Sequence, residues 1–149
     1  MSNIFDMTHE MSFREKSAWI SFVTILVVFG AYFWTIRSVL RGDIGYEAAF
    51  PVEVGLIVAF VLIEIALHIA LAMQSPSEAR APRDEREQLI EMRATRVAFQ
   101  VLVVGALAGV GLMHMTRSVW AMGQHMLLAV VVAQLVRFGG QILYFRRGV

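Results

Sequence analysis

Ionisable residues inside apolar sequence are the features of this chain that most suggest chemistry. Glu64 and His68 stand four positions apart within one apolar block, so they share a face of any helix formed there. Arg137 stands within another apolar block. An ionisable side chain near the centre of a membrane-spanning helix costs roughly 2.5–3.5 kcal/mol, so each of these groups needs a partner or a purpose.

Matching depth in the membrane suggests that these groups meet. Counted from expected helix centres near positions 62, 106 and 131, three polar side chains lie about six positions to the same side, or roughly 9 Å at the helical rise. Two more lie about a turn nearer the centre. We therefore predict one buried polar cluster, made of Glu64, His68, Gln100, Gln134 and Arg137.

Three roles are open to this cluster. In a structural role, Glu64 and Arg137 form a neutralising ion pair, and the other side chains complete the hydrogen bonds. In a functional role, His68 beside Glu64 changes charge near neutral pH, as a proton sensor or a proton path requires. A Glu and a His on one helix also suit a metal ion, but two ligands without a third make a weak metal site.

Methionine and histidine gather where the third apolar block ends and the fourth begins. The residues are Met113, His114, Met115, Met122, His125 and Met126. Thioether and imidazole ligands suit Cu(I), and a tight turn would bring the two groups together. However, methionine also fills gaps in helix bundles, and three consecutive helical residues point in different directions. We keep all but Met113 as weak candidate copper ligands and expect no cofactor.

Motifs for catalysis and for nucleic-acid binding are missing from the sequence. It contains no cysteine, phosphate loop, H-E-x-x-H motif or nucleophile triad, so we expect no enzyme. Basic residues between Arg80 and Arg96 alternate with acidic ones, which argues against direct nucleic-acid binding. This segment is either a solvated helix end or a surface that docks a partner. The candidate docking residues are Asp84, Glu85, Arg86, Leu89, Ile90 and Arg93.

Four apolar blocks must position all of these residues. The chain has 149 residues, of which 58% are hydrophobic and 17% charged, and the blocks cover 18–36, 54–73, 97–115 and 119–145. A helix needs roughly 20 apolar residues to cross about 30 Å of hydrocarbon. Because backbone polar groups in lipid must be satisfied internally, these block lengths favour helices. We predict an all-α integral membrane four-helix bundle that forms a single transmembrane domain over residues 1–149.

The expected spans are approximately 18–40, 51–73, 96–115 and 119–145, with one polar loop at 74–95. Ser12 and Glu15 form a capping box ahead of the first helix. Asp84 begins a similar cap, which predicts a helix from about Glu85 that continues unbroken to about Met115.

Two further features concern the ends and contacts of the helices. Pro51 suits the first turn of the second helix. The Gly105-x-x-x-Gly109 spacing allows close contact with another helix, either in the same chain or in a second copy. Tyr32 lies toward the far end of the first span, where it suits a belt of aromatic residues at the membrane surface.

Basic residues predict that both termini are cytoplasmic. Nine Lys or Arg residues lie near the span ends on one side and three on the other, and the larger group marks the cytoplasmic side. The nine are Arg14, Lys16, Arg80, Arg83, Arg86, Arg93, Arg96, Arg146 and Arg147; the three are Arg37, Arg41 and Arg117. The first apolar block is too long for a signal-peptide core and lacks a cleavage site, so we expect no cleavage.

A resemblance to a known group rests on two short stretches. The segment A-P-R-D-E-R-E-Q-L-I at 81–90 is followed by Arg93-Ala94 and an apolar block, and M-S-F-R-E-K-S-A-W-I stands at 11–20. This pattern resembles a group of small bacterial four-helix inner-membrane proteins of unknown function, over most of the chain from Met11. Such proteins are often found beside helix-turn-helix repressors. The resemblance therefore implies an inner-membrane location and a role in tethering or antagonising a cytoplasmic regulator.

Taken together, these features predict a non-enzymatic inner-membrane protein that acts through protein contacts. It would tether or antagonise a cytoplasmic helix-turn-helix regulator, or serve as an accessory subunit of a membrane complex. The alternative is a small proton or ion carrier that uses the buried Glu, His and Arg residues. Because so small a bundle leaves much surface facing the lipid bilayer, we also expect a homo-oligomer or a larger membrane complex.

Overall fold

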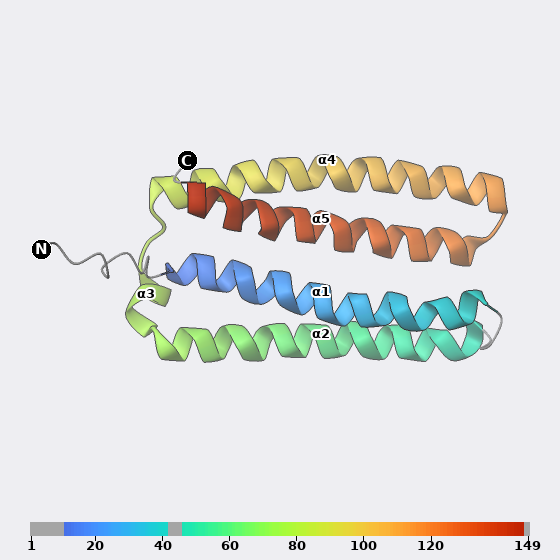
Figure 1. Cartoon of the computed structure of the whole chain (residues 1–149), viewed down its shortest axis with the longest axis horizontal. Coiled ribbons are helices and arrows are strands. Elements are labelled where there is room, and N and C mark those ends of the chain that lie inside the picture. The colour runs from blue at the N-terminus through green and yellow to red at the C-terminus, as the bar shows by residue number, and fades with distance from the viewer. Residues whose placement is uncertain (1–10, 42–45, 148–149) are drawn as a thin grey trace, which may run out of the picture.

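Four long helices make up most of the protein. The structure, a computed structural model, describes residues 11–41 and 46–147. Its elements are α1 (Phe13–Leu40), α2 (Tyr46–Gln74), α3 (Pro76–Arg80), α4 (Glu85–Thr116) and α5 (Val119–Arg147), and the described residues contain no strand. All but α3 are long and apolar enough to cross a membrane (Figure 1). The predicted all-α class with four membrane helices is confirmed.

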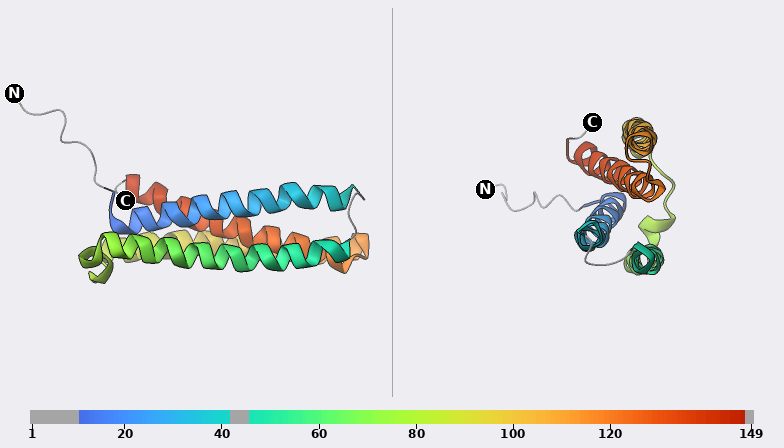
Figure 2. Two further views of the ribbon diagram at one scale, coloured as in Figure 1. Left: turned by 90° about the horizontal axis from the view of Figure 1, so that it is seen from below. Right: turned by 90° about the vertical axis from the view of Figure 1, so that its right-hand side faces the viewer.

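The four helices form a curved row and not a closed bundle. α1 packs against α2 on one side and α5 on the other, and α5 packs against α4. Figure 2 shows the resulting order, with α2 and α4 at the two ends of the row. The number and type of helices agree with the predicted four-helix bundle, and the structure adds their lateral order, which the sequence did not predict.

The longest charged connection, between α2 and α4, lies at one end of the row. α1 and α4 begin there, α2 and α5 end there, and α3 lies beside them, at the left of Figure 1. We call this the charged end and the other the opposite end. The described chain therefore starts and finishes on the same side, as four spans require, while the assignment of that side to the cytoplasm stays a prediction.

Side-chain caps fix where two of the helices begin. The Asp84 carboxylate accepts from the Glu85 backbone N–H at 2.7 Å, and the Glu87 carboxylate accepts from the Asp84 N–H at 3.4 Å, which completes a capping box. At α1, the Ser12 hydroxyl oxygen accepts from the Glu15 N–H at 3.2 Å. α4 then runs unbroken to Thr116, which confirms the predicted helix.

Two local features differ from expectation. α2 starts at Tyr46, so Pro51 lies inside the helix and not in its first turn. At that position proline has no backbone N–H to donate to the carbonyl of Glu47, four residues before it. The segment 74–95 also contains α3, which begins with Pro76 at its first position, where proline's missing N–H costs nothing.

Small residues allow α4 and α5 to approach closely. Both helices bury alanines, Ala94 and Ala98 on α4 and Ala129 and Ala133 on α5. A Cβ built on Gly105 would lie only 2.6 Å from the Cβ of Ala129. The predicted glycine contact therefore lies within one chain, between α4 and α5.

The glycine contacts also give the register of this antiparallel pair. Gly105 faces Ala129, and a Cβ built on Gly140 would lie 3.4 Å from the Cβ of Ala94. Counting between these pairs places Arg137 opposite Val97. Because α4 has no charged residue between Arg96 and Arg117, Arg137 lies level with the boundary of the apolar part of α4.

The central helix of the row is α1. In the apolar 18-residue stretch of α1, 33% of the residues are buried within the protein, against 6% in the corresponding stretch of α2. α2 therefore presents mostly lipid-facing surface. The main apolar cluster surrounds α1 and consists of Ile25, Phe29, Tyr32, Ile36, Ala49 and Val131. α2 therefore depends on α1 for its place in the row.

Candidate functional site

Polar side chains join α1 and α2 within the apolar region. The Ser21 hydroxyl donates to Glu64 Oε2 at 2.9 Å, and Ser17 Oγ lies 3.0 Å from His68 Nε2. His68 Nδ1 lies 2.8 Å from the backbone carbonyl of Glu64 and 3.3 Å from its Oε2. Glu64 and His68 therefore do share one site, and two serines of α1 complete it. We call these four residues the α1–α2 polar site.

The α1–α2 polar site can accommodate a change of protonation. The carbonyl of Glu64 only accepts, so His68 Nδ1 carries a hydrogen, and Nε2 of the neutral ring accepts from Ser17. If Nε2 gains a proton, the Ser17 hydroxyl can rotate and accept. Glu64 Oε1 is buried without a hydrogen-bond partner in the described chain. Both protonation states of His68 thus keep their hydrogen bonds.

Arg137 belongs to a different group. Its Nη2 donates to Glu91 of α4 at 3.2 Å, and Arg83 Nη1 donates to the other oxygen of the same carboxylate at 2.7 Å. The ion pair expected between Glu64 and Arg137 is therefore wrong. Depth along the helices was the basis of that expectation, but Glu64 faces α1 whereas Arg137 faces α4.

The two glutamines of the predicted cluster do not join these groups through a hydrogen bond. Gln100 is exposed on α4. Gln134 is half-buried on α5, and its Oε1 has no hydrogen-bond partner among the described residues. The five predicted residues are thus divided between the α1–α2 polar site, the α4–α5 ion pairs and separate positions.

A polar chain at the opposite end escaped the sequence analysis. The Tyr32 hydroxyl donates to Gln124 Oε1 at 2.5 Å, and Gln124 Nε2 donates to Glu53 Oε2 at 3.0 Å. It connects α1, α5 and α2. Tyr32 is only 2% exposed, so its assignment to a belt of surface aromatics is wrong. The available signal was Glu53 itself, an acid next to an apolar block with no basic residue near it in sequence.

The methionine and histidine residues at the opposite end differ in their surroundings, because some are exposed and others lie in the α4–α5 contact. The side chain of Met115 is 86% exposed, and His114 Nδ1 lies 2.9 Å from the carbonyl of Val110 on its own helix. His125 and Met126 instead lie against Gly109 in the α4–α5 contact. Met122 is half-buried on α5. The described residues contain no group of three or more His, Cys, Asp or Glu that could hold a metal ion.

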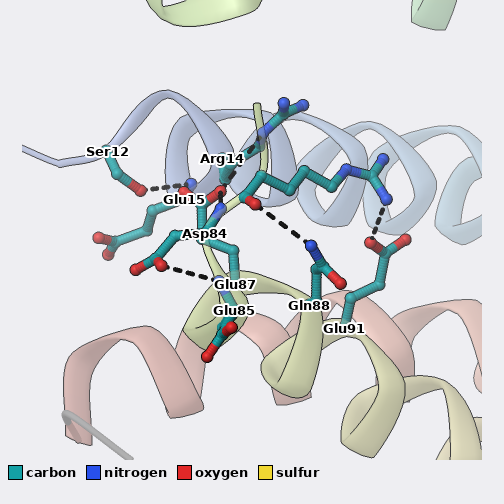
Figure 3. Close-up of polar contacts among 9 residues, drawn as sticks. Ser12, Arg14, Glu15, Asp84, Glu85, Glu87, Gln88 and Glu91 are labelled. Atoms are coloured by element: carbon teal, nitrogen blue, oxygen red, sulfur yellow. Dashed lines mark hydrogen bonds and ion pairs between the residues drawn. The ribbon is translucent and has the colours of Figure 1, made fainter. Parts of the chain in front are cut away.

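Ion pairs at the charged end connect three helices. Arg14 of α1 lies 3.9 Å from Glu87 of α4, and Arg146 of α5 lies 3.5 Å from Glu15 of α1. Figure 3 shows the first of these pairs beside the Asp84 cap. Each exposed pair contributes little stability by itself. Together they orient the start of α4 relative to α1 and α5.

Not all of the predicted docking residues are accessible. Ile90 is 1% exposed, so its assignment to a docking surface is wrong, and Arg86 donates to the carbonyl of Phe145 at 3.5 Å. Asp84 caps α4, and Glu85 is exposed beside it. By contrast, Leu89 is 48% exposed, and Arg93 is exposed one turn later.

The accessible residues at the start of α4 share one helical face. Leu89, Met92, Arg93 and Arg96 follow the spacing i, i+3, i+4, i+7. Met92 is 59% exposed, while Ile90 and Ala94, on the other face of this helix, are buried at 1%. We call these four residues the α4 outer face. It combines two apolar side chains with two arginines.

The comparison with known proteins identifies a family. No curated protein and no solved structure matches the chain. A family model described as "Predicted membrane protein (DUF2178)" matches residues 14–149, which include every helix from the second residue of α1 onward. With its four membrane-competent helices, this multi-pass membrane protein therefore belongs to the DUF2178 family of predicted membrane proteins, whose function is unknown.

Proposed function

We propose that this protein is a non-enzymatic protein of the bacterial inner membrane that binds a soluble cytoplasmic protein through the α4 outer face. The observation that carries this proposal is the exposure of Leu89 and Met92, at 48% and 59%, in the charged part of α4 before its apolar span. Exposed apolar side chains beside charged ones are typical of protein contact sites.

The first turns of α4 are held firmly, which suits a docking element. Ile90 and Ala94 bury one face of the helix, and the Asp84 cap fixes its start. Glu87 and Glu91 connect it to arginines of other segments. A helix fixed in this way loses little conformational freedom when a partner binds, so more of the contact energy appears as affinity.

Charge indicates the chemistry of the partner. Arg93 and Arg96 are the charged members of the α4 outer face, so a complementary surface would carry carboxylates around an apolar pocket. The resemblance to small bacterial membrane proteins found beside helix-turn-helix repressors makes a cytoplasmic regulator of that class our expected partner. Binding would tether the regulator at the membrane and keep it from its DNA.

Recovery of the partner from native membranes tests this function. We expect tagged full-length protein to recover one specific soluble protein, and the double variant Leu89→Asp/Arg93→Glu to recover at least about tenfold less, equivalent to about 1.4 kcal/mol. Mass spectrometry with labelled standards measures the recovery. Arg117→Glu, an exposed charge reversal at the opposite end, is the matched control. Equal recovery by the double variant, or no specific partner for the unmodified protein, contradicts the proposal.

A second candidate function rests on the α1–α2 polar site. We propose, as the alternative, that this site passes or senses protons, because Ser17 can either donate to or accept from His68. Only 6% of the residues in the apolar stretch of α2 are buried within the protein. Few apolar contacts therefore oppose a movement of this helix when the charge of the site changes. The same site then serves either as a step in a proton path or as a switch for α2.

Proton flux into liposomes tests the second candidate. We expect the reconstituted protein to equilibrate a pH gradient faster than empty liposomes, and Glu64→Gln to remove that flux because the amide cannot ionise. A trapped pH-sensitive dye gives the rate. Glu53→Gln, which makes the same change in the polar chain at the opposite end, should retain the flux. Unmodified protein that conducts no faster than empty liposomes would eliminate this candidate.

A further inference from the structure

A groove beside α4 and α5 combines positive charge with apolar surface. Its cavity volume is about 700 Å³. The residues that line it and matter here are Arg83, Glu91, Met92, Arg96, Phe99 and Arg137. Three guanidinium groups face one carboxylate, so the groove keeps a net charge of plus two.

The guanidinium groups retain donors for a further acceptor. Arg83 and Arg137 each give one N–H group to Glu91, whereas a guanidinium has five. Arg96 makes no ion pair within the described chain. Guanidinium groups bind phosphate oxygens well because their paired N–H groups match the spacing of those oxygens.

The groove lies at the expected depth of lipid headgroups. Arg96 and Arg117 bound the uncharged part of α4, and their separation is roughly 31 Å at the helical rise, close to the thickness of the hydrocarbon core. Arg137 lies level with this boundary by the α4–α5 register, and its side chain extends to Glu91, nearer the charged end. Long basic side chains extend in this way toward the membrane surface.

Apolar side chains continue from the groove toward the membrane interior. Phe99 lies one helical turn after Arg96, toward the membrane interior, and is 63% exposed. Val103, one turn further along α4, is 41% exposed. An acyl chain whose headgroup lies among the arginines would run along these residues. A soluble anion would use the arginines but leave this apolar strip uncovered.

We infer that this groove is a binding site for an anionic phospholipid, with the headgroup phosphate held by Arg83, Arg96 and Arg137 and an acyl chain along Phe99. Basic pockets between membrane helices at the membrane surface are typical sites for such headgroups. The groove shares Met92 and Arg96 with the α4 outer face, whereas Leu89 and Arg93 are not among the residues that line it. Lipid retention in the groove variants and partner recovery by Leu89→Asp/Arg93→Glu therefore report on different residues.

Native mass spectrometry of the full-length protein tests the inference. Protein in mild detergent is offered equal amounts of phosphatidylglycerol and phosphatidylcholine of matched chains. We expect about tenfold preferential retention of phosphatidylglycerol, as contacts to two or more arginines give. Arg83→Gln/Arg96→Gln should retain the two lipids equally. Arg80→Gln/Arg93→Gln removes the same charge from exposed positions outside the groove and should keep the preference.

Each other outcome overturns the inference. No preference in the unmodified protein, or the same preference in Arg83→Gln/Arg96→Gln, removes the site. Equal loss in both double variants makes the preference a general charge effect. Displacement of phosphatidylglycerol by glycerol 1-phosphate at comparable concentration indicates a site for soluble phosphate.

A Phe99→Ala variant tests the acyl-chain contact separately. Weaker retention of phosphatidylglycerol with an unchanged helical circular dichroism spectrum supports that contact.

Discussion

Gly105→Leu should lower the free energy of unfolding by about 3 kcal/mol, at the upper end of the range for an overpacked core. The first added carbon alone would lie 2.6 Å from the Cβ of Ala129, which is attached directly to the backbone and cannot turn aside. α4 and α5 would have to separate along their whole contact. Reversible unfolding in mixed detergent micelles measures the change.

Two comparisons make this prediction specific. Gly105→Ala should cost less than Gly105→Leu, because it adds one carbon to the α4–α5 contact and not four, while both changes gain about 1 kcal/mol or slightly less of helix propensity. Gly111→Leu is the matched control, since a Cβ built on Gly111 has nothing within 4 Å, and it should leave stability unchanged or raise it by up to about 1 kcal/mol through helix propensity. Equal losses at the two glycines would mean that α4 and α5 do not meet as described.

Gln124→Leu should lower the free energy of unfolding by about 1–3 kcal/mol, because it leaves the buried Tyr32 hydroxyl without its acceptor and Glu53 without its donor. Tyr32 is 2% exposed, so water does not replace the lost bond. This glutamine is the one hydrogen-bonded connection between α2 and α5 in the described residues. Its loss should therefore also weaken the position of α2.

A double-mutant cycle separates this hydrogen bond from a general loss of polarity. Tyr32→Phe should cost about 1 kcal/mol alone but little in the Gln124→Leu background, because the Tyr32 hydroxyl has already lost its acceptor there. Gln100→Leu makes the same change at an exposed position and should have little effect. Additive costs of the two changes would show that Tyr32 and Gln124 act independently.

The number of membrane-spanning helices and the positions of residues along them could be predicted from the sequence. Apolar block length gives the number of spans, because hydrocarbon thickness sets how many residues a helix needs. The D-x-x-E pattern at Asp84 located the start of α4, since a cap is a local contact between residues three apart. Pairing Glu64 with His68 also followed from spacing along one helix.

The lateral order of the helices could not be predicted in the same way. Depth places Glu64 and Arg137 near one level, but depth does not say which neighbour each helix faces. The structure puts α1 and α5 between α2 and α4, so serines of α1 and Glu91 of α4 supply the partners. Serines are common in membrane helices and gave no distinct signal.

The burial of Ile90 had a signal that the sequence analysis missed. Ile90, Ala94 and Ala98 are spaced by four residues and continue toward Gly105, so they form one stripe of the helix. Small residues along such a stripe mark a close helix contact. An apolar residue in line with them belongs to that contact and not to the solvated face, whereas Leu89 lies off the stripe.

Photo-crosslinking in native membranes tests the proposed partner contact most directly. A photoreactive residue at Leu89 should join one soluble protein covalently to the full-length chain, whereas the same residue at Val104, 68% exposed on the apolar part of α4, should not. Adding Arg93→Glu should reduce the product at position 89 strongly. A product at position 89 that contains only lipid or a second copy of this chain, or equal products at both positions, would contradict the account.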